Sequence, residues 1–135
     1  MVRPSKRDKR VAGLRQGAIE RGLQVKLSSR LKLPQELSRL DCACYLLNRE
    51  GDKRGKLGSG FKDTESGKIR CYGSLAGLED WVKECFDQLP EGAEAIVVSE
   101  KFAGVCWDEI GEQEDTEKIL IQLPRILELT QKKIN

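Results

Sequence analysis

The sequence contains no histidine among its 135 residues, and its aromatic side chains amount to only two Trp, two Tyr and three Phe. Without histidine the chain has no His-based nucleophile dyad, no His general base and no His-ligated metal site. No run of about 18 apolar residues occurs either, so we expect no membrane-spanning helix and no secretory signal peptide. Much of hydrolytic and metal chemistry is therefore disfavoured before any motif is considered.

The five cysteines, Cys42, Cys44, Cys71, Cys85 and Cys106, form no Cys-x-x-Cys pair of the kind that indicates zinc or a redox dithiol. Each lies in an apolar segment, where a free cysteine behaves as a small buried hydrophobe. An odd number of such residues suits a reducing compartment. We therefore predict that the thiols belong to the core.

Cys42 and Cys44 allow a second interpretation, because a two-residue spacing puts both thiols on one face of a strand. A metal site needs further ligands, and no histidine or third cysteine stands beside this pair in the sequence. We therefore expect no metal and no cofactor.

Hydrophobic residues make up 39% of the chain, which is enough to fill a core even though 34% of the residues are charged. The length fits one compact domain. We expect a single α+β domain over residues 11–135, preceded by a basic and partly exposed segment at residues 1–10.

Hydrophobic periodicity predicts three helices and about six strands. The expected helices cover residues 5–22, 75–89 and about 116–133, and Pro124 interrupts the last of them. The expected strands cover residues 23–27, 42–47, 57–62, 68–72, 93–99 and 102–107. Residues 31–40 are ambiguous, and residues 51–55 have the composition of a loop.

The order of these elements is α-β-β-β-β-α-β-β-α. Strands that come in neighbouring runs, with too few helices for a βαβ series, predict a mainly antiparallel sheet of five to six strands with the helices on one face. We expect the strands at 42–47, 57–62 and 68–72 to form a meander.

The net charge of +2 conceals a strong asymmetry along the chain. Residues 1–32 hold ten basic and two acidic residues, a net charge of +8, so the rest of the chain carries −6. Between Glu79 and Glu117 there are 13 acidic residues and only two basic ones. Such a chain either folds its basic arm against its own acidic face or offers the arm to an external polyanion.

The candidate binding residues are therefore the basic side chains of the stretch from Arg3 to Arg15: Arg3, Lys6, Arg7, Lys9, Arg10 and Arg15. Near an anionic membrane each such charge contributes about 1 kcal/mol of attraction. The same residues can neutralise nucleic-acid phosphates, but no aromatic side chain is interleaved with them to stack on bases. A simple solvated helix end is the third alternative.

Residues 108–115 are strongly acidic but lack the alternating ligands and the glycine position of a calcium-binding EF-hand loop. We expect a polar loop whose last acidic residues favour the N-terminus of the final helix. Glu109 is also a candidate ion-pair partner for the basic arm. Trp81 and Trp107 are candidate partner anchors if they are exposed, although core packing is the alternative that we favour.

No catalytic motif is recognisable, so we expect no enzyme and no catalytic residue. An enzyme would need a cysteine nucleophile with Asp, Glu or Lys as its base, because histidine is absent.

The segment Arg3-Pro4-Ser5-Lys6-Arg7, followed by Leu14-Arg15 and by residues 22–27, resembles a group of small uncharacterised proteobacterial proteins. The closing pattern of Trp107, Glu109 and Gly111 before a final amphipathic helix is similar as well. In that group an apolar N-terminal span precedes the Arg-Pro-Ser motif and an α+β domain follows it. Some members carry the label of a preprotein translocase accessory subunit. The resemblance implies a membrane-anchored protein whose domain lies on the cytoplasmic side, here without its anchor.

Together these features predict a non-enzymatic accessory or protein-interaction domain in the cytoplasm, at the inner face of the cell membrane. Its expected partner is an anionic membrane surface or a membrane protein complex. The alternative is a nucleic-acid-binding module that uses the same basic helix.

Overall fold

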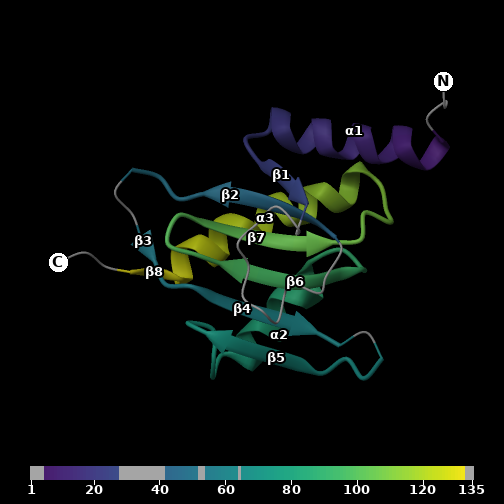
Figure 1. Cartoon of the computed structure of the whole chain (residues 1–135). Helices are drawn as coiled ribbons and strands as arrows, with labels where there is room; N and C mark the ends of the chain where they lie inside the picture. Colours follow the sequence, from purple (N-terminus) through teal and green to yellow (C-terminus); the bar gives the residue numbers. More distant parts are fainter. Residues whose placement is uncertain (1–4, 28–41, 52–53, 64, 133–135) are drawn as a thin grey trace.

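The computed structural model describes residues 5–27, 42–51, 54–63 and 65–132 (Figure 1). The helices are α1 (Lys6–Glu20), α2 (Glu79–Gln88) and α3 (Gln113–Leu129). The strands are β1 (Gln24–Leu27), β2 (Ala43–Asn48), β3 (Arg54–Gly55), β4 (Gly58–Lys62), β5 (Ile69–Gly73), β6 (Ala93–Val98), β7 (Phe102–Trp107) and β8 (Gln131–Lys132). Six of them form one antiparallel sheet in the order β1-β2-β7-β6-β4-β5, and β3 pairs with β8. The predicted α+β class and the order of the main elements are confirmed.

The two faces of the six-stranded sheet carry separate apolar clusters. Along β2, Ala43 and Tyr45 belong to the larger cluster, whereas Cys44 and Leu46 belong to the smaller one, because successive side chains of a strand point to opposite faces. All three helices contribute side chains to the larger cluster and none to the smaller one. In Figure 1, α2 and α3 lie behind the sheet, and α1 lies along its β1 edge.

The centre of the sheet is the hairpin of β6 and β7, which inserts between β2 and β4. The predicted meander of three consecutive strands is therefore wrong: β4 and β5 pair as expected, but β2 pairs with β1 and β7 instead. The burial pattern gives the reason. Five of the six residues in each of β6 and β7 are buried, so both faces need cover, whereas β1 and β5 are largely exposed and suit the edges.

Helix α1 begins and ends where the sequence predicts. The Ser5 hydroxyl accepts a hydrogen bond from the Asp8 amide at 3.0 Å, and the Asp8 carboxylate accepts one from the Ser5 amide at 3.1 Å. At the other end Gly22 has a φ of +94°, and the Leu23 amide donates to the carbonyl of Ala18. A glycine in this conformation ends a helix without the steric cost that a side chain would bring.

Three boundaries differ from the predicted ones. The second helix begins at Glu79 rather than at residue 75, because residues 75–78 form a turn that buries Leu75. The last helix begins at Gln113, where Glu112 and Asp115 form its capping box, and it ends at Leu129, before β8. Residues 54–55 form a strand where a loop was expected, because they pair with β8.

Two predicted features lie outside the described residues: Arg3 and the ambiguous segment 31–40. The expected boundary after residue 10 falls inside α1, which continues from Lys6 to Glu20 without a break. In the described part of the chain, no helix combines the length and the apolar character needed to cross a membrane.

Two glycine substitutions should change stability in opposite directions. A Cβ at Gly104, on β7, would collide with the side chain of Leu46 and meet Val97 Cγ2 at 3.2 Å, so Gly104→Ala should lower the free energy of unfolding by about 1–3 kcal/mol. A Cβ at Gly13, on α1, would meet nothing within 4 Å, so Gly13→Ala should raise it by about 0.5–1 kcal/mol. Urea unfolding measures both values, and equal effects would contradict this packing of β7.

Candidate functional site

Helix α1 is held against the domain by its C-terminal half. Leu14 and Ala18 are buried in the larger apolar cluster, whose members include residues of α3 and of the sheet. Arg21, just beyond the helix, forms an ion pair with Glu117 of α3. One face of α1 therefore packs against the rest of the domain.

The loop between β7 and α3, residues 108–112, reaches along α1 (Figure 1). Arg10 Nη1 donates a hydrogen bond to the carbonyl of Gly111 at 2.7 Å. At the start of α3, Gln113 Nε2 donates to the carbonyl of Gly13 at 2.8 Å. These contacts bring the acidic loop and the basic helix together, over a sequence separation of about 100 residues.

A partly buried ion pair of Arg15 and Glu109 also joins them. Arg15 Nε donates to Glu109 Oε2 at 2.8 Å, and Arg15 Nη2 donates to Oε1 at 2.6 Å, so both carboxylate oxygens are engaged. The Tyr45 hydroxyl donates to Oε2 at 2.9 Å. Tyr45 in turn packs edge-on against Trp107, with ring centroids 5.8 Å apart. The network therefore joins α1, β2, the end of β7 and the loop.

Glu109 needs these hydrogen-bond partners because of its burial and its backbone conformation. Its side chain is 6% exposed, and an unpaired carboxylate at such a position would be expensive to bury. Its φ of 62° is also unfavourable for a residue with a Cβ. The hydrogen bond from Arg15 stabilises the pair and raises the pKa of the Arg15 guanidinium further, whereas burial first and Glu109 second raise the pKa of the Tyr45 hydroxyl. The predicted partnership between Glu109 and the basic arm is confirmed.

The candidate binding residues now separate into two groups. Lys6, Arg7 and Lys9 are exposed, and none of the ion pairs in the described part of the chain involves them; we call these three residues the basic end of α1. Arg10 is half-buried and bonded to the loop, and Arg15 is occupied by Glu109. Arg15 therefore fastens α1 to the loop, and its guanidinium is already bonded to Glu109.

An exposed apolar side chain accompanies the basic end. Ile110 is 67% exposed and stands in the loop between Glu109 and Gly111, both of which contact α1. The basic end also lies at the N-terminus of α1, where the helix dipole is positive. Positive charge is therefore concentrated at that end of α1, and the loop that bonds to Arg10 carries one exposed apolar side chain.

The two tryptophans have different environments. Trp107 is fully buried, and its indole Nε1 donates to the carbonyl of Glu91 at 3.2 Å. It is therefore a core residue and cannot anchor a partner. Trp81 is partly buried and lines a groove of about 440 Å³ between α2 and α3, together with Glu84 and Arg125.

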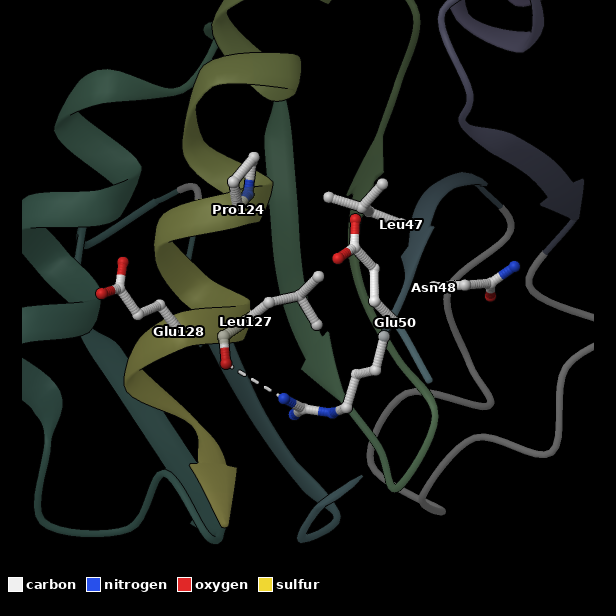
Figure 2. Close-up of a pocket in the computed structure, with 7 residues that line it drawn as sticks. Leu47, Asn48, Glu50, Pro124, Leu127 and Glu128 are labelled. Atoms are coloured by element: carbon white, nitrogen blue, oxygen red, sulfur yellow. Dashed lines mark hydrogen bonds between the residues drawn. The ribbon is translucent and has the colours of Figure 1, made fainter. Parts of the chain in front are cut away.

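A second groove, of about 490 Å³, lies between the end of β2 and the C-terminal half of α3 (Figure 2). Figure 2 shows Leu47 and Glu50 on one side of it and Leu127 on the other. Arg49 also lines this groove but donates to the carbonyls of Ser99 and Leu127 and to the Thr130 hydroxyl. These bonds satisfy the end of α3, so the guanidinium has a structural role.

Three of the five thiols lie together in the smaller apolar cluster. Cys44 of β2 is the direct antiparallel partner of Cys106 of β7, and their sulfurs are 2.7 Å apart. Cys42 joins them, and all three sulfurs lie within 4.8 Å of one another. The sequence analysis missed Cys106 because only the pairing of β2 with β7, which no local pattern specifies, brings it to this pair.

The thiols are poor nucleophiles in these surroundings. For Cys44, hydrogen bonding to Cys106 lowers the pKa, but the contact with Cys42 and burial outweigh it and raise the pKa to about 12. Hydrogen bonds to Cys42 and Cys44, with burial, raise the pKa of Cys106 as well. Burial raises the pKa values of Cys71 and Cys85 to about 11. Thiolate formation near neutral pH is disfavoured at all four positions.

Comparisons with protein-family models, with curated proteins and with solved structures found no match to this chain. The fold and the side chains described above therefore carry the functional inference.

Glu109→Gln should weaken the fold, because it removes the charge from one partner of a buried pair and leaves the other unbalanced. Since the Arg15 side chain is 37% exposed, we expect a loss of about 2–3 kcal/mol in the free energy of unfolding, less than for a fully buried pair. The matched control is Glu117→Gln, whose ion pair with Arg21 is exposed and should contribute less than about 1 kcal/mol. Urea unfolding of the two variants checks this, and similar losses would contradict the role given to Glu109.

Proposed function

We propose that this protein is a non-enzymatic interaction domain that rests on an anionic membrane surface through the basic end of α1 and Ile110. The observation that carries the proposal is that the basic residues of α1 fall into two groups with different contacts. Arg10 and Arg15 bind the protein's own loop, whereas Lys6, Arg7 and Lys9 project from the domain without a described ion pair. The fold thus holds a small cationic surface in a defined orientation.

The expected free energy of attraction between the basic end of α1 and an anionic membrane is small, which suits an accessory role. Three charges at about 1 kcal/mol each contribute roughly 3 kcal/mol, or about a hundredfold in partitioning. That attraction orients a domain that is already near a membrane but does not hold a free one there. The domain is accordingly proposed to be the cytoplasmic part of a membrane-anchored protein, as the resemblance of residues 3–7 implies.

A nucleic-acid-binding module is the second candidate, because the same three side chains can contact phosphates. Ile110 favours the membrane, since an exposed isoleucine can enter the headgroup region but gains little beside a phosphate backbone. In addition, α1 carries no aromatic side chain on which bases would stack.

A catalytic role has little support in the described residues. The thiols of Cys44, Cys71, Cys85 and Cys106 have raised pKa values, so each is mostly protonated near neutral pH. A thiol in this state is a weak nucleophile.

The first test is co-sedimentation with anionic lipid vesicles at low salt. The variant Lys6→Glu/Arg7→Glu/Lys9→Glu should lose binding by about a hundredfold or more, because it converts attraction into repulsion. A matched control with the same change in net charge is Lys62→Glu/Lys68→Glu/Arg70→Glu. Its residues are exposed on β4, β5 and their connecting turn, at the sheet edge opposite β1. Equal losses in both variants would show a general charge effect and contradict the proposed surface.

The second test separates membrane from nucleic acid. Ile110→Ser should weaken vesicle binding several-fold, because it removes the apolar group that enters the interface, and should leave binding to short DNA and RNA unchanged. The control is Leu129→Ser, at the end of α3, where a leucine is 64% exposed. If Ile110→Ser has no effect on vesicles while the charge-reversed variant loses nucleic-acid binding, the second candidate replaces the first.

A further inference from the structure

The smaller apolar cluster contains the three cysteines Cys42, Cys44 and Cys106, which we call the thiol triad. Cys44 and Cys106 face each other across β2 and β7, and Cys42 stands two residues before Cys44, on the same face. Cys44 and Cys106 are fully buried and Cys42 is 7% exposed. The three sulfurs lie mutually within 4.8 Å, two of them on the adjacent strands β2 and β7 and the third on the residue that precedes β2.

We propose that the thiol triad is a binding site for a soft, thiophilic metal ion. Metal–sulfur bonds of about 2.3 Å place the sulfurs of three thiolate ligands about 4 Å apart around the ion. To reach that geometry the Cys44 and Cys106 sulfurs must move from 2.7 Å to about 4 Å apart, while the three sulfurs already lie within 4.8 Å of one another. Cys44 and Cys106 lie on adjacent strands, which hold ligands more reproducibly than loops do, and Cys42 directly precedes β2.

The residues around the three sulfurs indicate which class of metal ion the site would bind. Leu46, Ala95 and Val97 belong to the same cluster, and no carboxylate of the described residues joins the three sulfurs in one ligand group. Hard ions such as Mg²⁺ and Ca²⁺ need oxygen ligands, and structural Zn²⁺ sites take four ligands. A site with three sulfur ligands suits a soft ion such as Cu(I).

The strand register places one basic residue on the same face. Lys26 of β1 is the direct antiparallel partner of Cys44, so the two residues share a face of the sheet with their Cβ atoms about 5 Å apart. Lys26 is exposed. Metal-bound thiols are deprotonated, so loading of the folded protein releases protons.

Cu(I) is the probe for the test, added under anaerobic reducing conditions to the full chain in competition with a chromogenic Cu(I) chelator. The wild type should take one equivalent, and Cys44→Ala and Cys106→Ala should each weaken binding by about a hundredfold or more. Cys85→Ala is the matched control, because Cys85 is buried in the other cluster, and it should bind as the wild type does. With Cu(I) about a hundredfold above its Kd, the melting temperature of the wild type should rise by roughly 5–10 °C.

X-ray absorption of the Cu(I)-loaded wild type gives a readout that does not depend on whether the variants fold. Three sulfur neighbours at about 2.3 Å are the expected result. A shell with fewer sulfurs, or with nitrogen or oxygen ligands, would overturn the proposal. So would equal Cu(I) uptake by Cys44→Ala and Cys85→Ala, or a wild type that forms a Cys44–Cys106 disulfide and takes up no Cu(I).

Discussion

The bidentate ion pair between Arg15 and Glu109 is the interaction on which the arrangement of the basic helix depends. It joins a cationic helix to an acidic loop about 90 residues further along the chain. Tyr45 adds a third hydrogen bond from the sheet, so α1, the sheet and the loop meet at one carboxylate. Because Glu109 is buried and adopts an unfavourable backbone conformation, its position is stable only while these partners are present.

This contact explains why the charge asymmetry of the chain does not lead to a free basic tail. Part of the positive charge is neutralised internally by Glu109, and Arg10 donates a hydrogen bond to a loop carbonyl. The remainder, Lys6, Arg7 and Lys9, stays at the helix N-terminus, where positive side chains oppose the helix dipole. Association with an anionic surface would relieve that repulsion, and Ile110 in the adjoining loop adds an apolar contact. The Arg15–Glu109 ion pair and the proposed membrane contact therefore both follow from how the positive charges are distributed along α1.

Local chemistry in the sequence was sufficient to predict the three helices and the six strands of the main sheet, but not the short strands β3 and β8. Ser5, Asp8 and Gly22 defined α1, and short apolar segments bounded by turn residues located the six strands. Strand order could not be predicted from local patterns. The place of β6 and β7 at the centre of the sheet follows from the burial of both of their faces, which depends on the rest of the fold. The thiol triad could not be predicted from local patterns either. Cys42 and Cys44 were recognisable as a pair from their spacing, but Cys106 lies beside them only because β2 pairs with β7. Arg15 was indistinguishable from the other basic residues until Glu109 was placed beside it.

The most direct test of the account is amide hydrogen exchange of the wild-type protein with and without anionic vesicles. The account predicts that vesicles slow exchange in two segments far apart in the sequence, the start of α1 at residues 5–10 and the loop at residues 108–112, and leave the strands β4 and β5 unchanged. Protection of both segments together would show that the ion pair presents them as one surface. Protection of the groove between α2 and α3 instead, or of the start of α1 alone, would contradict it.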